Sequence, residues 1–198
     1  MYKRQNHRYE ENKLVTQTAD NGTRRFIAWI SVAILIVAAD QATKWAIIEW
    51  VPLYDRVPIN DFLNLTHQQN KGAAFSFLAD QSGWQRWFFV VLASAVSVMI
   101  TVWLWRIRND GPVVLVAGLA LVLGGAVGNL IDRLMLGYVT DFIQVWFGNW
   151  AFPSFNVADS AISVGAVLLI IDAFFVSGRQ EQSAAAPAKQ QSNEPKQD

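Results

Sequence analysis

The sequence predicts an all-α integral membrane protein with four transmembrane helices. The chain of 198 residues is 53% hydrophobic and has a mean hydropathy of +0.21, which is too apolar for an ordinary water-soluble protein. Only 16% of the residues are charged, and they are unevenly placed. Four apolar segments have roughly the 20 residues that a helix needs to cross a bilayer. They cover residues 26–48, 84–105, 112–131 and 157–176.

The two ends of the chain have a different composition. Residues 1–22 are polar, mixed in charge and end in an Asp-Asn-Gly turn, while residues 179–198 have the composition of a disordered segment. We therefore predict a four-helix membrane domain over residues 23–178, flanked by two flexible cytoplasmic tails. A cleavable signal peptide ending near residue 39 is an alternative for the first segment. The apolar pattern resumes at residues 45–48, which favours one continuous helix.

The distribution of positive charge predicts the orientation. With four spans, both tails and the turn at 106–111 share one side, which holds eleven of the 16 Lys and Arg residues. Cytoplasmic segments carry such an excess, so both termini are expected in the cytoplasm. Aromatic residues are enriched at membrane interfaces. The tryptophans predicted to lie at the outer interface are Trp45, Trp50, Trp84, Trp87, Trp146 and Trp150.

Two segments on the predicted outer side, residues 49–83 and 132–156, contain most of the irregular sequence between the spans. Residues 62–68 and 73–77 are typical of strands, with a candidate turn at 70–72 between them. Functional residues are often carried on such loops. Polar side chains gather here and at the adjoining helix ends. The set comprises Asp40, Gln41, Lys44, Asn70, Asn129, Asp132, Arg133, Asp141, Asn156 and Asp159.

Several of these residues have ordinary structural explanations when taken singly. Asn156 can cap the fourth helix, with Asp159 in its first turn, where the helix dipole favours an acidic side chain. Asp40 and Lys44 are four residues apart and can form a structural pair. Arg133 can anchor the third helix at the lipid headgroups. The convergence of so many polar groups on one layer is the observation that points to a functional site.

The residue types limit the chemistry of this layer. The chain has no cysteine, and its histidines, His7 and His67, do not cluster with the polar set, which argues against a Ser–His–Asp triad and a zinc site. A Ser76–Lys71 dyad would place its members on opposite faces of a strand. A pair of carboxylates is the remaining candidate for catalysis in this layer. One ionised carboxylate can take a proton from water while a protonated partner donates to a carbonyl oxygen.

Five motifs in the sequence resemble those of the lipoprotein signal peptidase (signal peptidase II) family of the bacterial cytoplasmic membrane. They are DQATK at 40–44, NKGAAFSF at 70–77, GGAVGNLIDR at 124–133, GYVTDF at 137–142 and FNVADS at 155–160. The resemblance covers residues 26–177. It implies four transmembrane helices, a small β-sheet cradle on the outer face and a short surface helix.

The resemblance also implies an aspartic endopeptidase that uses no metal and no cofactor. The two catalytic aspartates match Asp141 and Asp159. The remaining matches are the substrate-binding residues Asp40, Asn70, Asn129, Arg133 and Asn156 and the supporting residues Lys44, Gly72 and Asp132.

The implied substrates are prolipoproteins whose cysteine already carries a diacylglyceryl group, and cleavage occurs just before that cysteine. The implied location is the bacterial inner membrane, with the active site near the outer face and globomycin as an inhibitor. We expect a monomer in the lipid bilayer. Because the net charge is zero, we expect no binding to nucleic acid. Two alternatives are a small membrane carrier with interfacial carboxylates and a Ser–Lys signal peptidase built on Lys71.

Overall fold

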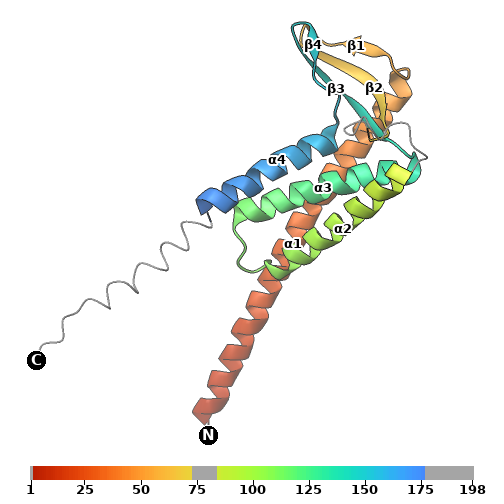
Figure 1. The fold of residues 1–198 in the computed structure, drawn as a ribbon. Coiled ribbons are helices and arrows are strands. Elements are labelled where there is room, and N and C mark those ends of the chain that lie inside the picture. Colours follow the sequence, from red (N-terminus) through yellow and green to blue (C-terminus); the bar gives the residue numbers. More distant parts are fainter. Residues whose placement is uncertain (1, 73–83, 177–198) are drawn as a thin grey trace, which may run out of the picture.

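The computed structural model describes residues 2–72 and 84–176, and its side chains are described for residues 20–72 and 84–175. Helices pack side by side, and a small sheet lies at one end of the bundle, called the sheet end below (Figure 1). The elements are α1 (Tyr2–Trp50), α2 (Trp84–Arg106), α3 (Val113–Met135), α4 (Val157–Ile171) and the π-helical turn η2 (Asp172–Val176). Four helical segments of the described chain are long and apolar enough to cross a membrane, which confirms the predicted spans.

Helix α3 lies at the centre of the bundle and contacts α1, α2 and α4. Its Leu119 is buried in the main core together with Ala33 of α1 and Ile100 of α2. Large apolar side chains elsewhere on the helices point outward, including Val98 and Val167. Such exposure would be costly in water and is expected for helix faces that contact lipid.

Glycines on α3 allow the neighbouring helices to approach closely near the predicted polar layer. A Cβ atom added at Gly124 would lie 2.8 Å from the carbonyl oxygen of Ala33 on α1. A Cβ atom added at Gly128 would lie 2.7 Å from Oδ2 of Asp40. Small residues let helix backbones come close in membranes, and here they bring α1 against α3 at the level of the acidic side chains.

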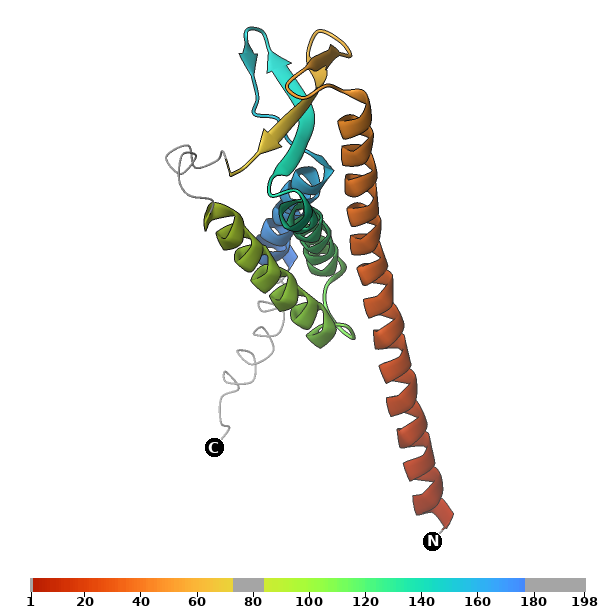
Figure 2. The ribbon, with the colours of Figure 1, turned by 90° about the vertical axis from the view of Figure 1, so that its right-hand side faces the viewer.

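The sheet has four antiparallel strands in the order β1-β2-β3-β4. Both ribbon views show it beyond the end of α1 and the start of α4 (Figures 1 and 2). Ile47 and Val51 pack with Phe142 in a second small core, which fixes the sheet to α1. The strands are β1 (Arg56–Pro58), β2 (Leu63–Asn70), β3 (Val139–Phe147) and β4 (Trp150–Ala151).

The predicted strand at 62–68 is confirmed as β2, but the predicted partner at 73–77 lies outside the described residues. Within the described chain, β2 pairs with β1 and with β3, which comes from the second of the two segments predicted to lie on the outer side. The residues described between α1 and α2 and between α3 and α4 contain no short helix. The small sheet itself agrees with the cradle that the family resemblance implied.

The register between β2 and β3 places two predicted site residues together. Gln68 pairs with Asp141 and Asn70 with Val139, after a bulge in β2 between Leu65 and Gln68. Asn70 therefore ends β2 beside Asp141, although the two residues are 71 positions apart.

The N-terminal segment differs from the predicted flexible tail, because α1 begins at Tyr2. The helix continues well past the ends of the other three helices (Figure 2). Extending an existing helix needs no new nucleation, and residues 2–22 contain no proline to stop it. The second predicted tail, residues 179–198, lies outside the described residues.

We predict that Gly128→Ala lowers the free energy of unfolding by about 1–3 kcal/mol, because the added methyl group presses on the Asp40 carboxylate. Helix propensity alone would give the opposite sign, since alanine stabilises a helix relative to glycine. Thermal unfolding of the purified variant in detergent measures the change. An unchanged or higher Tm would contradict the close approach of α1 and α3.

Candidate active site

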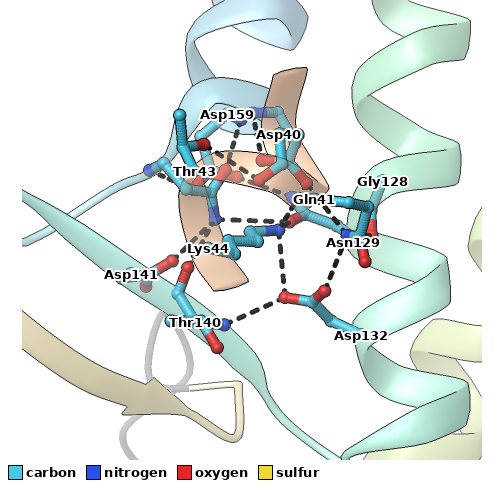
Figure 3. Close-up of polar contacts among 12 residues, drawn as sticks. Asp40, Gln41, Thr43, Lys44, Gly128, Asn129, Asp132, Thr140, Asp141 and Asp159 are labelled. Carbon is cyan, nitrogen blue, oxygen red and sulfur yellow. Dashed lines mark hydrogen bonds and ion pairs between the residues drawn. The ribbon is translucent and has the colours of Figure 1, made fainter. Parts of the chain in front are cut away.

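The predicted polar layer forms one connected cluster at the sheet end of the bundle (Figure 3). Asp141 comes from β3 and is almost fully buried, while Asp159 comes from the first turn of α4 and is half-buried. The two carboxylates are linked through Asn156. Its side-chain amide donates to Oδ1 of Asp141 at 2.8 Å, and its backbone N–H donates to Oδ2 of Asp159 at 3.3 Å.

The start of α4 places Asp159. Asn156 is the N-cap, and its side-chain oxygen accepts a hydrogen bond from the backbone N–H of Asp159 at 2.8 Å. The bond in the other direction, from the Asn156 N–H to the Asp159 carboxylate, completes a capping box. The cap interpretation is therefore confirmed. The same capping geometry fixes the Asp159 side chain beside Asp141.

The end of β2 places the second partner of Asp141. Nδ2 of Asn70 donates to Oδ2 of Asp141 at 2.9 Å, and Oδ1 of Asn70 accepts the backbone N–H of Gly72 at 2.9 Å. Gly72 has a φ of 113°, a conformation that side chains strongly disfavour. Gly72 thus holds the Asn70 amide in the orientation that donates to the carboxylate.

A third asparagine reaches the pair from α3. Nδ2 of Asn129 donates to Oδ1 of Asp159 at 2.8 Å, while its Oδ1 accepts from Nζ of Lys44 at 2.9 Å. All four carboxylate oxygens of Asp141 and Asp159 therefore accept a hydrogen bond from one of three asparagines. Buried carboxylates require such partners, and neutral amides supply them without adding charge.

Burial raises the pKa of Asp141 to about 7. The hydrogen bond from Asn70 opposes this increase, the negative charge of Asp159 adds to it, and Asn156 and Lys44 oppose it. A carboxyl group with this pKa exchanges its proton readily at neutral pH. The site can therefore hold one protonated and one ionised carboxyl group, which is the state that acid–base chemistry on a peptide bond needs.

A groove lies between α2, α3 and α4, and Asn129, which donates to Asp159, is part of its lining. It has a volume of about 280 Å³, and Asn129 and Arg133 line it together with apolar side chains such as Leu92 and Val96. The guanidinium of Arg133 lies 4.9 Å from the ring centre of Phe89 and donates to the backbone oxygen of Asn129 at 3.2 Å. The groove combines polar groups near the carboxylates with an apolar path along the helices.

Asp40 and Asn156, which the resemblance implies to be substrate-binding residues, lie in the interior of the protein. Both are fully buried, with 0% of their surface exposed. The expected Asp40–Lys44 pair is confirmed, with Nζ of Lys44 at 2.7 Å from Oδ2 of Asp40 and at 3.0 Å from Oδ2 of Asp132. Among the described side chains, no three His, Asp or Glu residues are arranged to hold a metal ion.

Gln41 belonged to the predicted polar set without an assigned role, and Phe89 was not singled out by the sequence. Gln41 follows Asp40 directly, and its side chain lies within the acidic cluster, where it donates to Oδ1 of Asp132 at 2.8 Å. The sequence indicated a special position for Gln41 only through its polar side chain within an apolar span. Nothing in the sequence distinguishes Phe89 from the other aromatic residues of its segment.

The fold and the site together define a class of protein: a four-span membrane protein with one buried and one half-buried aspartate paired beneath a small sheet. Residues 32–175 match the family described as signal peptidase (SPase) II. The lipoprotein signal peptidase of Acinetobacter baumannii is 48% identical over 160 residues, which cover 81% of this chain and 90% of that protein. The corresponding protein of Pseudomonas syringae pv. tomato is 50% identical over 159 residues, covering 79% and 91%.

A solved bacterial membrane enzyme, determined by the in meso method, has a similar fold with a TM-score of 0.67 and 30% identity. The match covers 76% of this chain and 94% of that one. The chain belongs to the signal peptidase II family, as the five motifs indicated.

We predict that Asp141→Asn changes how stability depends on pH. The pKa of Asp141 is raised in the folded state, so its ionisation opposes folding as the pH rises through about 7. The variant lacks this ionisation, and its Tm relative to the parent should increase as the pH rises from about 4 to about 7 and then level off up to about pH 8.5.

Thermal unfolding in detergent across this pH range measures the effect. The matched control is Asp61→Asn, which changes an exposed carboxylate before β2. Its Tm difference from the parent should stay constant. A constant difference for Asp141→Asn would mean that this carboxyl group ionises normally.

Proposed function

We propose that this protein removes the signal peptides of diacylglyceryl-modified prolipoproteins by cleaving the bond just before the lipid-modified cysteine. The main observation is the pair of aspartates, Asp141 and Asp159, held by three asparagines at one end of a four-span bundle. Membership of the signal peptidase II family supports the choice of substrate.

In the proposed reaction, the carboxyl pair acts on a water molecule bound between the aspartates and the peptide carbonyl. The ionised carboxylate takes a proton from water as its oxygen attacks the carbonyl carbon, and the protonated carboxyl group donates its proton to the carbonyl oxygen. When the tetrahedral intermediate breaks down, the C–N bond breaks and the proton taken from water passes to the amine nitrogen. The other carboxylate takes a proton from a hydroxyl group of the intermediate, so the pair again holds one proton. The two groups titrate as a unit, so both roles belong to the pair.

The half-buried groups around the pair are proposed to hold the substrate. Arg133 and Asn70 lie at the edge of the site, where their N–H groups can bind carbonyl oxygens of an extended peptide. The groove beside Arg133 is lined mostly by apolar side chains, which can bind the apolar part of a signal peptide. We assign Asp40 and Asn156 to supporting roles, since both are fully buried.

We propose that the sheet end faces the outside of the bacterial inner membrane and that both termini lie in the cytoplasm. The excess of Lys and Arg on the other side of the bundle supports this orientation. Exposed tryptophans at the sheet end suit a membrane interface. They are Trp45, Trp50, Trp84, Trp87 and Trp150.

One chain supplies both aspartates and all three asparagines, which supports a monomer as the active unit. We further propose that globomycin inhibits the protein by occupying the groove at Asn129 and Arg133. A cyclic peptide with an apolar part would match the polar and apolar halves of that groove.

Asp141→Asn and Asp159→Asn are each expected to lower the cleavage rate by about 10²–10⁴-fold, because each removes one partner in proton transfer. The assay uses the full chain in liposomes with a diacylglyceryl-modified peptide and follows the two products by mass spectrometry. Asp61→Asn is the control and should cleave at the parent rate, since this exposed residue lies outside the cluster.

Near-parent cleavage by either aspartate variant would refute the carboxylate pair. If Lys71→Ala abolished cleavage while both aspartate variants cleaved normally, the site would be a Ser–Lys dyad. Proton flux across the liposome membrane without cleavage of any lipidated peptide would identify a carrier instead.

A further inference from the structure

Helix α1 contributes neither aspartate of the catalytic pair, yet three of its polar residues lie directly behind that pair. Asp40, Gln41 and Lys44 project from its last turns towards α3 and α4 (Figure 3). Burying an acidic, an amide and a basic side chain inside an apolar bundle opposes folding unless each is fully paired. Their contacts show what they hold in place.

Lys44 has its full set of hydrogen-bond partners within the protein. Only 2% of its surface is exposed, and its Nζ lies 2.7 Å from Asp40, 2.9 Å from Asn129 and 3.0 Å from Asp132. An ammonium group has three N–H donors, so these three acceptors satisfy it. Lys44 therefore has no donor left for a substrate or for the reacting water.

The two carboxylates that Lys44 joins each hold one peptide group. Oδ1 of Asp40 accepts the backbone N–H of Ala158 at 2.9 Å, and Oδ2 of Asp132 accepts the backbone N–H of Thr140 at 3.0 Å. Ala158 immediately precedes Asp159, and Thr140 immediately precedes Asp141. On each side of Lys44, a carboxylate thus accepts the backbone N–H of the residue that precedes one of the paired aspartates. Asp40 does so at α4, and Asp132 does so at β3.

Gln41 connects the two carboxylates a second time. Its Nε2 donates to Oδ1 of Asp132 at 2.8 Å and lies 3.3 Å from Oδ2 of Asp40 and 3.2 Å from the backbone oxygen of Gly128. One ammonium and one amide therefore hold Asp40 and Asp132 together. The absence of a side chain at Gly128 leaves the space that this arrangement occupies.

We infer that Lys44 is a positioning residue that sets the separation of Asp141 and Asp159 by holding Asp40 and Asp132 together. The inference deepens the proposed function and rests on it. Without the ammonium, two buried carboxylates would repel each other at short range. The peptide groups before Asp141 and Asp159 would then move apart, because each is hydrogen-bonded to one of these carboxylates.

Lys44 also acts through its charge. Among the described residues, four carboxylates interact with its charge, namely Asp40 on α1, Asp132 on α3, Asp141 on β3 and Asp159 on α4. Arg133 on α3 is a further cation that interacts with the last three of these carboxylates. The positive charge of Lys44 opposes the effect of burial on the pKa of Asp141. Removing this charge should therefore move the pH dependence of cleavage to higher pH.

The test uses Lys44→Met, which keeps a long apolar side chain and removes the ammonium. The full chain in liposomes should lose about 100-fold in kcat, since a displacement of about 1 Å in a reacting group costs this much. KM for the lipidated peptide should change little, and the pH–rate profile should shift upward. Trp45→Phe is the control, because this residue is 67% exposed on the same helix.

A second variant covers the case in which Lys44→Met does not fold, as judged by Tm and gel filtration. Gln41→Met removes only the amide bridge between Asp40 and Asp132 and should lower kcat about 10-fold with KM retained. Parent-like kcat and pH profile in the folded Lys44→Met protein, or parent-like kcat in Gln41→Met if the first variant is unfolded, would overturn the inference. Failure of the parent chain to cleave the peptide would instead refute the proposed function.

Discussion

The structure depends on the burial of two ionisable carboxyl groups, Asp141 and Asp159, at the end of an apolar helix bundle. Burial without partners would make ionisation of either group very costly. Three asparagines supply hydrogen bonds to all four oxygens and leave the net charge of the pair unchanged. Burial raises the pKa of Asp141 to about 7, and the hydrogen bonds from Asn70 and Asn156 oppose this increase without returning the pKa to its ordinary value. The same burial that opposes folding thus prepares the group for proton transfer.

The rest of the fold can be understood as the means of bringing these groups together. The capping box at Asn156 uses a common helix start to orient Asp159, and the register of β2 and β3 brings Asn70 to Asp141. Glycines on α3 let α1 approach until its acidic and basic side chains reach the cluster. The same contacts therefore stabilise the fold and position the site residues. Most substitutions at these positions are expected to change stability and activity together.

The sequence was informative where interactions are local. Hydropathy and length predicted the four spans, and the spacing of Asn156 and Asp159 predicted the helix cap, because both signals lie within a few residues. The pairing of β2 with β3 was not predicted, since it joins segments about 70 residues apart and depends on the whole bundle. The depth of Asp40 was also not predicted, because its exposure depends on how closely α1 packs against α3.

The central claim is that the site holds a carboxyl group that remains protonated close to neutral pH. Infrared spectroscopy of the purified protein in lipid measures this directly, because protonated and ionised carboxyl groups absorb at different frequencies. The account predicts a protonated carboxyl band that titrates at about pH 7 and is missing from Asp141→Asn. A spectrum in which every carboxyl group is ionised by about pH 5, close to the ordinary range for Asp and Glu, would contradict it.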